Sequence, residues 1–391
     1  MLKIWLGSLV RISSWAQEII SSRCRRHGLH PILKFKSLDA GAGSRHGFKE
    51  QFTTMAFIQL AARRSMRDGI RCLAAAGKRL YHWGLRNVAR STFADANNSR
   101  PVGFFKDLFH EMYALCAAKA PKHKFRFRSK LISMDATTIK LSLSLFSWAS
   151  FRQGKGGIKM HTVLDHNGGI PMLITVTDAK SHESRIARDT ELPRGSIVVF
   201  DKGYINYSWF QELGNKDVTF VTRLKRNARY KLIERRPVNH NTGVTSDHII
   251  EVTVREKKLR LRRIGYRDHE TGKHYEFLTN HFRLSPKTIA DIYKDRWQIE
   301  LFFKEIKQNL RIKHFVGNSE NAVMIQLYTA LTVYLLLAYQ KFLSQIGLSV
   351  QQILEIIQLN LFGTVSLEEL LYPRQREKQN PYYFSLLNCA A

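Results

Sequence analysis

Apolar and polar residues recur at different intervals along the chain, and each interval predicts a different kind of element. From position 47 to about 119, apolar residues at helical spacing predict several short helices. Further on, alternating or continuous short apolar runs predict strands over residues 131–135, 157–165, 170–177, 197–200 and 218–222. The polar turn 166–169 joins two of them as a hairpin. Short helices expected over 184–192 and 208–213 complete the pattern of a mixed α/β sheet.

The pattern changes again after this sheet. Residues 248–256 and 257–263 alternate with period two, which predicts a β-rich, basic insertion from 223 to about 280. Ser285 and Pro286 then provide an N-cap and a first helical residue for a helix that runs through Leu310. The apolar stretches 322–343 and 350–361 predict helices that pack in the core.

These changes in pattern divide the chain into six expected segments. They are a weakly patterned basic segment (1–46), a helical region expected to bind DNA (47–122), the first part of a catalytic core (123–222), the β-rich insertion (223–284), the final core helices (285–346), and a C-terminal helix with a polar tail (347–391). For the helical region, the alternative is a plain bundle that adjoins the core.

The net charge of the chain indicates what kind of molecule it binds. The chain has 62 Lys and Arg residues against 32 Asp and Glu residues, a net charge of +30 spread along most of its length. A folded protein with this surplus is expected to bind a polyanion, and nucleic acid is the first choice. The alternatives are a protein kept soluble by its charge and a protein of the membrane surface.

The cysteines and the apolar runs indicate the cellular compartment in which the protein is expected. The four cysteines are single and widely spaced, which excludes a zinc knuckle or a disulfide framework and fits reduced thiols in a cytosol. The apolar N-terminal run is cut by Arg11 and is too short for a signal peptide. Polar residues interrupt 322–340, which favours a buried helix over a transmembrane span. We expect a cytoplasmic, nucleoid-associated protein without a membrane partner.

The helix expected over 285–310 carries a row of functional side chains. At about 100° per residue, Tyr293, Arg296, Glu300 and Lys307 fall within an arc of about 60°. A separate apolar arc, suited to burial, contains Ile292, Ile299, Phe302, Phe303, Ile306 and Leu310. The row spans about 21 Å, enough to follow several nucleotides. An ordinary surface helix with i,i+3 and i,i+4 pairs is the alternative.

Three carboxylates stand out by their position. Asp135 ends the strand expected over 131–135, Asp201 lies where the buried strand 197–200 ends, and Glu300 lies in the polar row of the helix. Three such groups repel one another unless a cation joins them, and Mg²⁺ or Mn²⁺ prefers carboxylate oxygens. Two such ions activate a water or a 3′ hydroxyl and stabilise the leaving oxygen of a phosphodiester. A single Asp at a strand end, taken alone, is more often a turn or cap residue.

The spacing Tyr293-x2-Arg296-x3-Glu300-x6-Lys307 resembles the YREK signature of bacterial transposases of the insertion sequence four family. The blocks MDATTIK, VFDKGYINY and LRIKHFVGNSENA resemble that family too, and the likeness covers about residues 47–365. Residues 1–45 depart from the family's usual opening.

The resemblance implies a ribonuclease-H-like fold with Asp135, Asp201 and Glu300 as a DDE triad that binds two magnesium ions, for which manganese substitutes. Tyr293, Arg296 and Lys307 would hold double-stranded DNA. The implied activity is cut-and-paste transposition by a homodimer that synapses the terminal inverted repeats and joins them to target DNA. Two alternatives are an inactive DNA-binding relative and a nuclease of the same fold without strand transfer.

Other residues are weaker candidates. His161 and His182 are possible metal ligands, but a strand histidine is more often simply hydrogen-bonded. The loop 154–157 lacks a phosphate-loop signature and is interpreted as a basic DNA-facing loop. Trp297 either stacks on a flipped base or packs against the sheet. The run KKLRLRR (257–263) either follows a DNA backbone or is a solvated strand face, and the charge favours DNA.

Overall fold

The computed structural model describes residues 47–77, 80, 86–152, 155–179, 183–254, 257–310, 312, 314–344 and 347–360. They belong to two compact units, one formed by 1–100 with 344–391 and the other by 101–343. The expectations for segment 1–46 and for the polar tail lie outside the described residues.

The first unit contains helices α3 (Phe48–Leu60), α4 (Met66–Ala75), α6 (Arg90–Ser99) and α13 (Val350–Asn360). The helical character expected here is confirmed, and α3 is buried along almost its whole length. Ser91, a residue type that often caps helices, lies inside α6. The helix starts one residue earlier because the amide of Phe93 donates to the carbonyl of Ala89, which is the N-cap.

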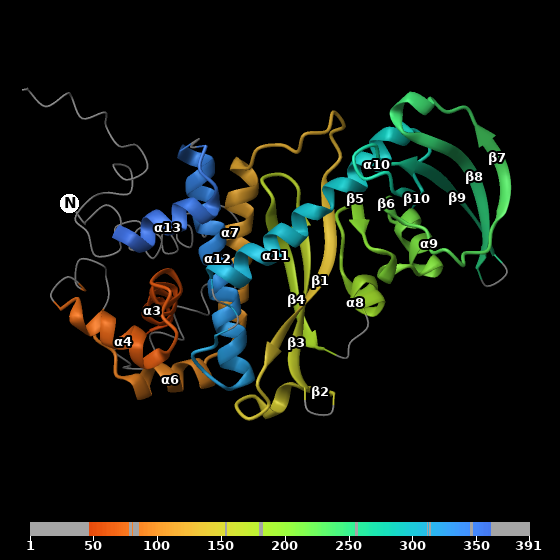
Figure 1. The fold of residues 1–391 in the computed structure, drawn as a ribbon. Helices are drawn as coiled ribbons and strands as arrows, with labels where there is room; N and C mark the ends of the chain where they lie inside the picture. The colour runs from red at the N-terminus through yellow and green to blue at the C-terminus, as the bar shows by residue number, and fades with distance from the viewer. Residues whose placement is uncertain are drawn as a thin grey trace, which may run out of the picture. The chain divides into compact units, whose positions relative to one another are not determined.

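The second unit is built on a ten-stranded sheet (Figure 1). Its first part consists of β1 (Leu131–Leu141), β2 (Ser150–Arg152), β3 (Lys155–Asp165), β4 (Ile170–Asp178), β5 (Ile197–Phe200) and β6 (Thr219–Arg223). β1 pairs antiparallel with β3 and parallel with β5, β3 pairs antiparallel with β4, and β5 pairs parallel with β6. This mixed order is the ribonuclease-H-like arrangement that the sequence resemblance implied.

The β-rich insertion extends this same sheet. It contributes β7 (Lys231–Arg236), β8 (Val244–Val254), β9 (Lys257–Arg267) and β10 (His274–Thr279), and β10 pairs antiparallel with β6. The curved strands of Figure 1 therefore continue from the core sheet. The sequence pattern did not predict β7, because nearly all its residues are exposed and no apolar face marks it.

Helices support the sheet of the second unit. They are α7 (Gly103–Lys119), α8 (Glu183–Asp189), α9 (Tyr207–Asn215), α10 (Pro286–Asp295), α11 (Trp297–Asn309) and α12 (Glu320–Ser344). Among the described residues, α12 is the one helix long and apolar enough to cross a membrane, yet 94% of its most apolar window is buried within the protein. It is therefore the core helix that the sequence predicted.

Aromatic packing fixes the end of β5, where the sheet carries one of the candidate carboxylates. Ile197 to Phe200 are all buried, as their continuous apolar run predicted. The ring of Phe200 lies 4.9 Å from that of Trp209 and 5.8 Å from that of Phe210. These contacts hold the last residue of β5 in place. Core packing therefore also fixes the backbone position of the next residue, Asp201.

The helix expected to run unbroken from Ser285 to Leu310 is interrupted at Arg296. Ser285 caps α10 as predicted, by accepting from the amide of Thr288. At the junction, the amide of Arg296 donates to the carbonyl of Tyr293, and the amide of Ile299 donates to that of Arg296. Such i→i+3 bonds tighten the turn, so Tyr293 and Lys307 belong to two consecutive helices and not to one regular arc.

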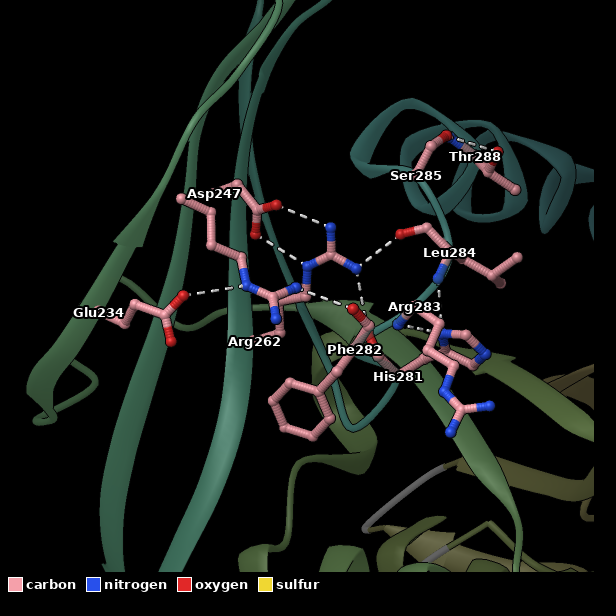
Figure 2. Close-up of polar contacts among 10 residues, drawn as sticks. Glu234, Asp247, Arg262, His281, Phe282, Arg283, Leu284, Ser285 and Thr288 are labelled. Atoms are coloured by element: carbon pink, nitrogen blue, oxygen red, sulfur yellow. Dashed lines mark hydrogen bonds and ion pairs between the residues drawn. The ribbon is translucent and has the colours of Figure 1, made fainter.

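A buried ion pair ties the insertion to the chain entering α10 (Figure 2). Arg262 on β9 donates through Nε and Nη2 to the two carboxylate oxygens of Asp247 on β8, at 2.8 and 2.7 Å. Its Nη1 donates to the carbonyls of His281 and Leu284, at 3.2 and 2.6 Å. One residue of the basic run KKLRLRR is therefore a structural anchor. Lys257 and Arg260 of the same run are exposed.

Candidate active site

Two aspartates lie at the same level of adjacent strands. Met134 of β1 pairs with Phe200 of β5 in parallel register, and each of the two is followed by an aspartate, Asp135 and Asp201. Neighbouring strands lie about 4.8 Å apart. Asp201 follows its strand as predicted, and its Oδ1 accepts from the amide of Lys202 at 2.6 Å, at the start of the turn η2 (Lys202–Tyr204).

Asp135 does not end its strand, contrary to the sequence-based expectation. β1 continues to Leu141 because it remains paired with β3 after its parallel pairing with β5 has stopped at Met134. Asp135 therefore lies where β1 leaves the middle of the sheet. Its Oδ1 accepts from the amide of Ala136 at 2.8 Å.

Arg296 joins the third carboxylate to the first. Its Nη1 donates to Oδ2 of Asp135 at 3.1 Å, and its Nη2 donates to Oε1 of Glu300 at 2.6 Å. Glu300 lies in the first turn of α11, which packs against β1 (Figure 1). The apolar arc predicted for this helix, including Ile299 and Ile306, is buried. Two of the three predicted carboxylates thus share one guanidinium.

The other members of the polar row also lie along this region. Lys307 donates through Nζ to Oγ1 of Thr137 and, at 3.2 Å, to the carbonyl of Thr138 on β1. The ring of Tyr293 lies 5.0 Å from that of Phe277 and 5.7 Å from the Arg296 guanidinium. Burial raises the pKa of Tyr293 to about 12, and the charge of Asp201 also raises it. The row therefore extends from near Asp201 to the second half of β1.

The electrostatics of Asp135 reflect its crowded surroundings. Burial raises the pKa of Asp135 to about 6, although the hydrogen bond from Ala136 and the charge of Arg296 act in the opposite direction. The negative charges of Glu183 and Glu300 raise this pKa further. Asp135 is therefore a carboxyl whose ionised form needs a positive partner.

Glu183 and Tyr204 belong to this neighbourhood, and the sequence reasoning did not single them out. Oε2 of Glu183 would lie 3.1 Å from a Cβ atom at Gly203, just after Asp201. The Oη atom of Tyr204 is buried and has no hydrogen-bond partner among the described residues. Desolvation raises the pKa of Tyr204 strongly, and the charges of Glu183, Asp135 and Asp201 add to the rise. The only sequence signal was position: Glu183 lies near the start of an expected helix, and Tyr204 follows the DKG turn.

A basic hollow opens beside Asp201. Its volume is about 680 Å³, and it is lined by Asp201, Lys202, Gly203, Arg223, Leu224, Lys225, Arg226 and Asn227. Lys202 comes from η2, whereas Arg223, Lys225 and Arg226 come from the end of β6 and the loop after it, at the same carboxyl edge of the sheet as Asp201. In the sequence, this loop falls in the expected insertion 223–284, for which no role was predicted at these positions. Three cations within the four residues 223–226, directly after the expected buried strand 218–222, were the signal available.

The residues present suit a divalent ion, although no three Asp, Glu, His or Cys side chains among the described residues have metal-ligand spacing. Asp135 and Asp201 offer hard oxygen atoms from neighbouring strands, and Glu300 offers another from α11. The Arg296 guanidinium reaches both Asp135 and Glu300, so one positive group is able to serve both carboxylates. Asp135, Asp201 and Glu300 would hold the ion.

The weaker sequence candidates have different outcomes. His161 is buried, and its Nε2 lies 3.0 Å from Oγ1 of Thr177, so the hydrogen-bonded interpretation is confirmed. Burial also lowers the pKa of His161 to about 4. Trp297 is 57% exposed, so the alternative that it packs against the sheet is wrong. His182 and Gly154 lie outside the described residues. Residues 155–157 belong to β3, where Gly156 and Gly157 are buried and pair with β1, so the interpretation of this segment as a DNA-facing loop is wrong.

Comparisons with known proteins agree with this architecture. The family model of the transposase DDE domain matches residues 126–336, and a model of a domain of unknown function matches residues 44–86. The chain is 35% identical to the putative transposase y4zB of Sinorhizobium fredii, over 69% of this chain and 76% of that protein. It is 26% identical to a protein of Geobacillus stearothermophilus named as the probable transposase for insertion sequence element IS5377, over 66% and 68% of the two chains.

A solved structure is also similar, at 10% identity and a TM-score of 0.40. It is a piggyBac transposase in a synaptic complex with hairpin DNA, and the similarity covers 90% of this chain and 79% of that chain.

Proposed function

This chain belongs to the DDE transposase family, and from that premise we propose that it cleaves the ends of its own insertion sequence and joins them to target DNA. The proposed reaction is divalent-metal-dependent phosphoryl transfer by a cut-and-paste route. The proposed catalytic residues are Asp135, Asp201 and Glu300. The observation that carries the proposal is that β1 and β5 bring two aspartates to the same level, with Glu300 tied to one of them through Arg296.

The three carboxylates account for the proposed metal dependence. When bound, two magnesium or manganese ions supply the Lewis acidity that activates a water or a 3′ hydroxyl and stabilises the leaving oxygen. Asp135 and Asp201 would orient these ions from a rigid sheet, and Glu300 would do so from α11. The partial burial of all three residues also limits how far each carboxylate moves, which favours precise alignment with a phosphodiester.

Cationic residues on both sides of the carboxylates support a path for the DNA backbone. Lys307 and Arg296 lie along α11, and Lys225 and Arg226 line the hollow beside Asp201. A phosphodiester strand that follows this path passes the carboxylates between two groups of positive charge. Tyr293, partly buried and packed beside Phe277, contributes a ring near Arg296.

The partners proposed for this enzyme are the terminal inverted repeats of its element, a target duplex and a second copy of the chain. A homodimer gives each of two transposon ends one set of carboxylates. The relatives named as transposases of insertion sequences support this proposal.

The decisive experiment uses a duplex that carries the inverted repeats found in the DNA flanking the gene. With Mg²⁺, we expect the wild-type protein to nick this duplex at the element's end and to join the end to a second DNA. Asp201→Ala should lose nicking by at least about 10³-fold while its affinity for the end stays within about twofold. Asp107→Ala, which changes an exposed acid on α7, is the matched control and should cleave normally.

The other outcomes decide between the alternatives. Nicking without joining would identify a nuclease of the same fold. Specific end binding without metal-dependent nicking by the wild-type protein would identify an inactive DNA-binding relative. Nicking that survives in Asp201→Ala would overturn the assignment of the site.

A further inference from the structure

A buried chain of hydrogen bonds lies next to the carboxylates, and the function proposed above makes no use of it. Oγ of Ser133 lies 2.6 Å from Nε2 of His166, and Nδ1 of His166 lies 2.7 Å from Oδ2 of Asp295. Ser133, His166 and Asp295 are 0%, 4% and 8% exposed. Because Ser133 is closed to substrate, this Ser–His–Asp chain is not a hydrolytic site. Its role must be structural or positional.

Asp295 is the point where several segments of the second unit meet. Besides His166 from the β3–β4 turn, Nζ of Lys124 lies 2.6 Å from its Oδ1. Nε2 of Gln298, in the first turn of α11, donates to its Oδ2 at 2.7 Å. Asp295 is also the last residue of α10, directly before Arg296. Its contacts therefore fix the junction from which α11 starts.

The contacts between α11 and β1 follow a regular order. Ser133, Asp135 and Thr137 alternate along β1, so their side chains share one face of the strand. Ser133 reaches Asp295 through His166, Asp135 contacts Arg296, which also holds Glu300, and Thr137 contacts Lys307. From β1, these contacts thus reach the end of α10, the junction with α11, and α11 itself at three successive levels. Of these, the first is the most completely buried.

The buried level, at Ser133, is suited to hold in place the contacts at the levels of Asp135 and Thr137. Water competes poorly for its hydrogen bonds, and both nitrogens of the His166 ring have partners. At the second level, by contrast, two carboxylates depend on one guanidinium, and Glu300 is about one-third exposed. A shift of α11 along β1 would leave the buried polar groups of the first level unpaired, which costs more free energy than the loss of partly exposed contacts, so the buried level defines the alignment.

We propose that Ser133, His166 and Asp295 are positioning residues that set the register of α11 on β1 and thereby fix the positions from which Asp135 and Glu300 would bind a divalent ion. The inference rests on the proposed function, because it assumes that these carboxylates bind the ion. It predicts an effect on metal affinity that is separate from any effect on folding.

The test is a Mn²⁺ titration of the full chain, followed by electron paramagnetic resonance of the free ion. Ser133→Ala and Asp295→Asn should each raise the Mn²⁺ concentration for half-saturation by about tenfold or more, as is usual when a residue behind a metal ligand is removed. Their affinity for the end duplex should stay within about twofold. Cleavage by both variants should recover toward the wild-type rate at saturating Mn²⁺.

Asp291→Asn is the matched control. Asp291 lies one turn before Asp295 on the same helix and forms a partly exposed ion pair with Lys287. The same change of charge there should leave the half-saturating Mn²⁺ concentration unchanged. Thermal unfolding of each variant, with Ser133→Ala as the smaller change, separates loss of folded protein from loss of affinity.

Two results would overturn the inference. One is a half-saturating Mn²⁺ concentration in Ser133→Ala equal to that of Asp291→Asn. The other is a loss of cleavage rate that saturating Mn²⁺ does not restore, which would indicate a role in folding alone. A wild-type protein that neither binds Mn²⁺ nor cleaves would instead contradict the proposed function.

Discussion

At the scale of single residues, the arrangement around Arg296 shows how the chain holds two acids together without a metal. Its guanidinium bonds to Asp135 and to Glu300, and its planar fork suits such double contacts better than an ammonium group. Asp135 nevertheless keeps a raised pKa, because burial outweighs the attraction of Arg296. The site is therefore short of positive charge, which favours uptake of cations.

The raised pKa of Asp135 predicts how the free energy of unfolding depends on pH. The pKa of Asp135 is about 6 in the folded protein and 3.8 ordinarily, so between these values the folded state binds more protons than the unfolded state. Without metal, the contribution of Asp135 to the free energy of unfolding should fall by roughly 1–3 kcal/mol as pH rises from about 4 to about 6. Above about pH 6.5 it should level off.

Urea unfolding of the wild type and of Asp135→Asn in a chelating buffer measures this contribution as a difference. The variant stays neutral throughout, and all other acids titrate in both proteins. A difference in unfolding free energy that stays constant from pH 4 to 7 would contradict the prediction.

At the scale of elements, α11 and β1 form a single functional unit, because the polar side of the helix contacts one face of the strand. Lys307 is the last of these contacts, and its bonds to Thr137 and Thr138 hold its ammonium group at the edge of the site. If a DNA phosphate also binds there, Lys307 adds one counterion to the electrostatic part of the affinity.

Lys307→Ala should weaken binding to the end duplex and reduce the slope of log K against log salt by about 1. Lys216→Ala is the control, since Lys216 precedes β6 at the opposite end of the strand from Arg223. Fluorescence anisotropy at several salt concentrations measures both slopes. Equal slopes for Lys307→Ala and the wild type would show that Lys307 makes no phosphate contact.

At the scale of the whole molecule, a net charge of +30 predicts that binding is strongly dependent on salt. Each neutralised phosphate contributes about −0.9 to the slope for duplex DNA, so six or more contacts give a slope of about −5 or steeper. The measurement is the affinity of the wild-type protein for the end duplex and for an unrelated duplex. A slope shallower than about −2 would mean that most of the positive charge does not contact DNA.

The sequence was most informative where one local rule decided the outcome. The run 197–200 had to be a buried strand, and its acid had to follow it, because four apolar residues between two glycines have few other solutions. It was least informative where exposure hid the pattern, as in β7, or where pairing with another strand decided the length, as in β1. The six expected segment boundaries stay predictions, although α7 belongs to the compact unit that contains the sheet.

The sequence by itself determined the apolar side of α11, the buried strand before Asp201, the surplus of charge and the spacing of the candidate site residues. Each of these depends only on composition or on the order of residues within a short stretch. Only the tertiary structure decided that Arg296 joins Asp135 to Glu300, that Glu183 and Tyr204 lie close by, and that Ser133 reaches Asp295 through His166. These contacts join residues up to 161 positions apart, and strand register, which no short stretch specifies, brings them together.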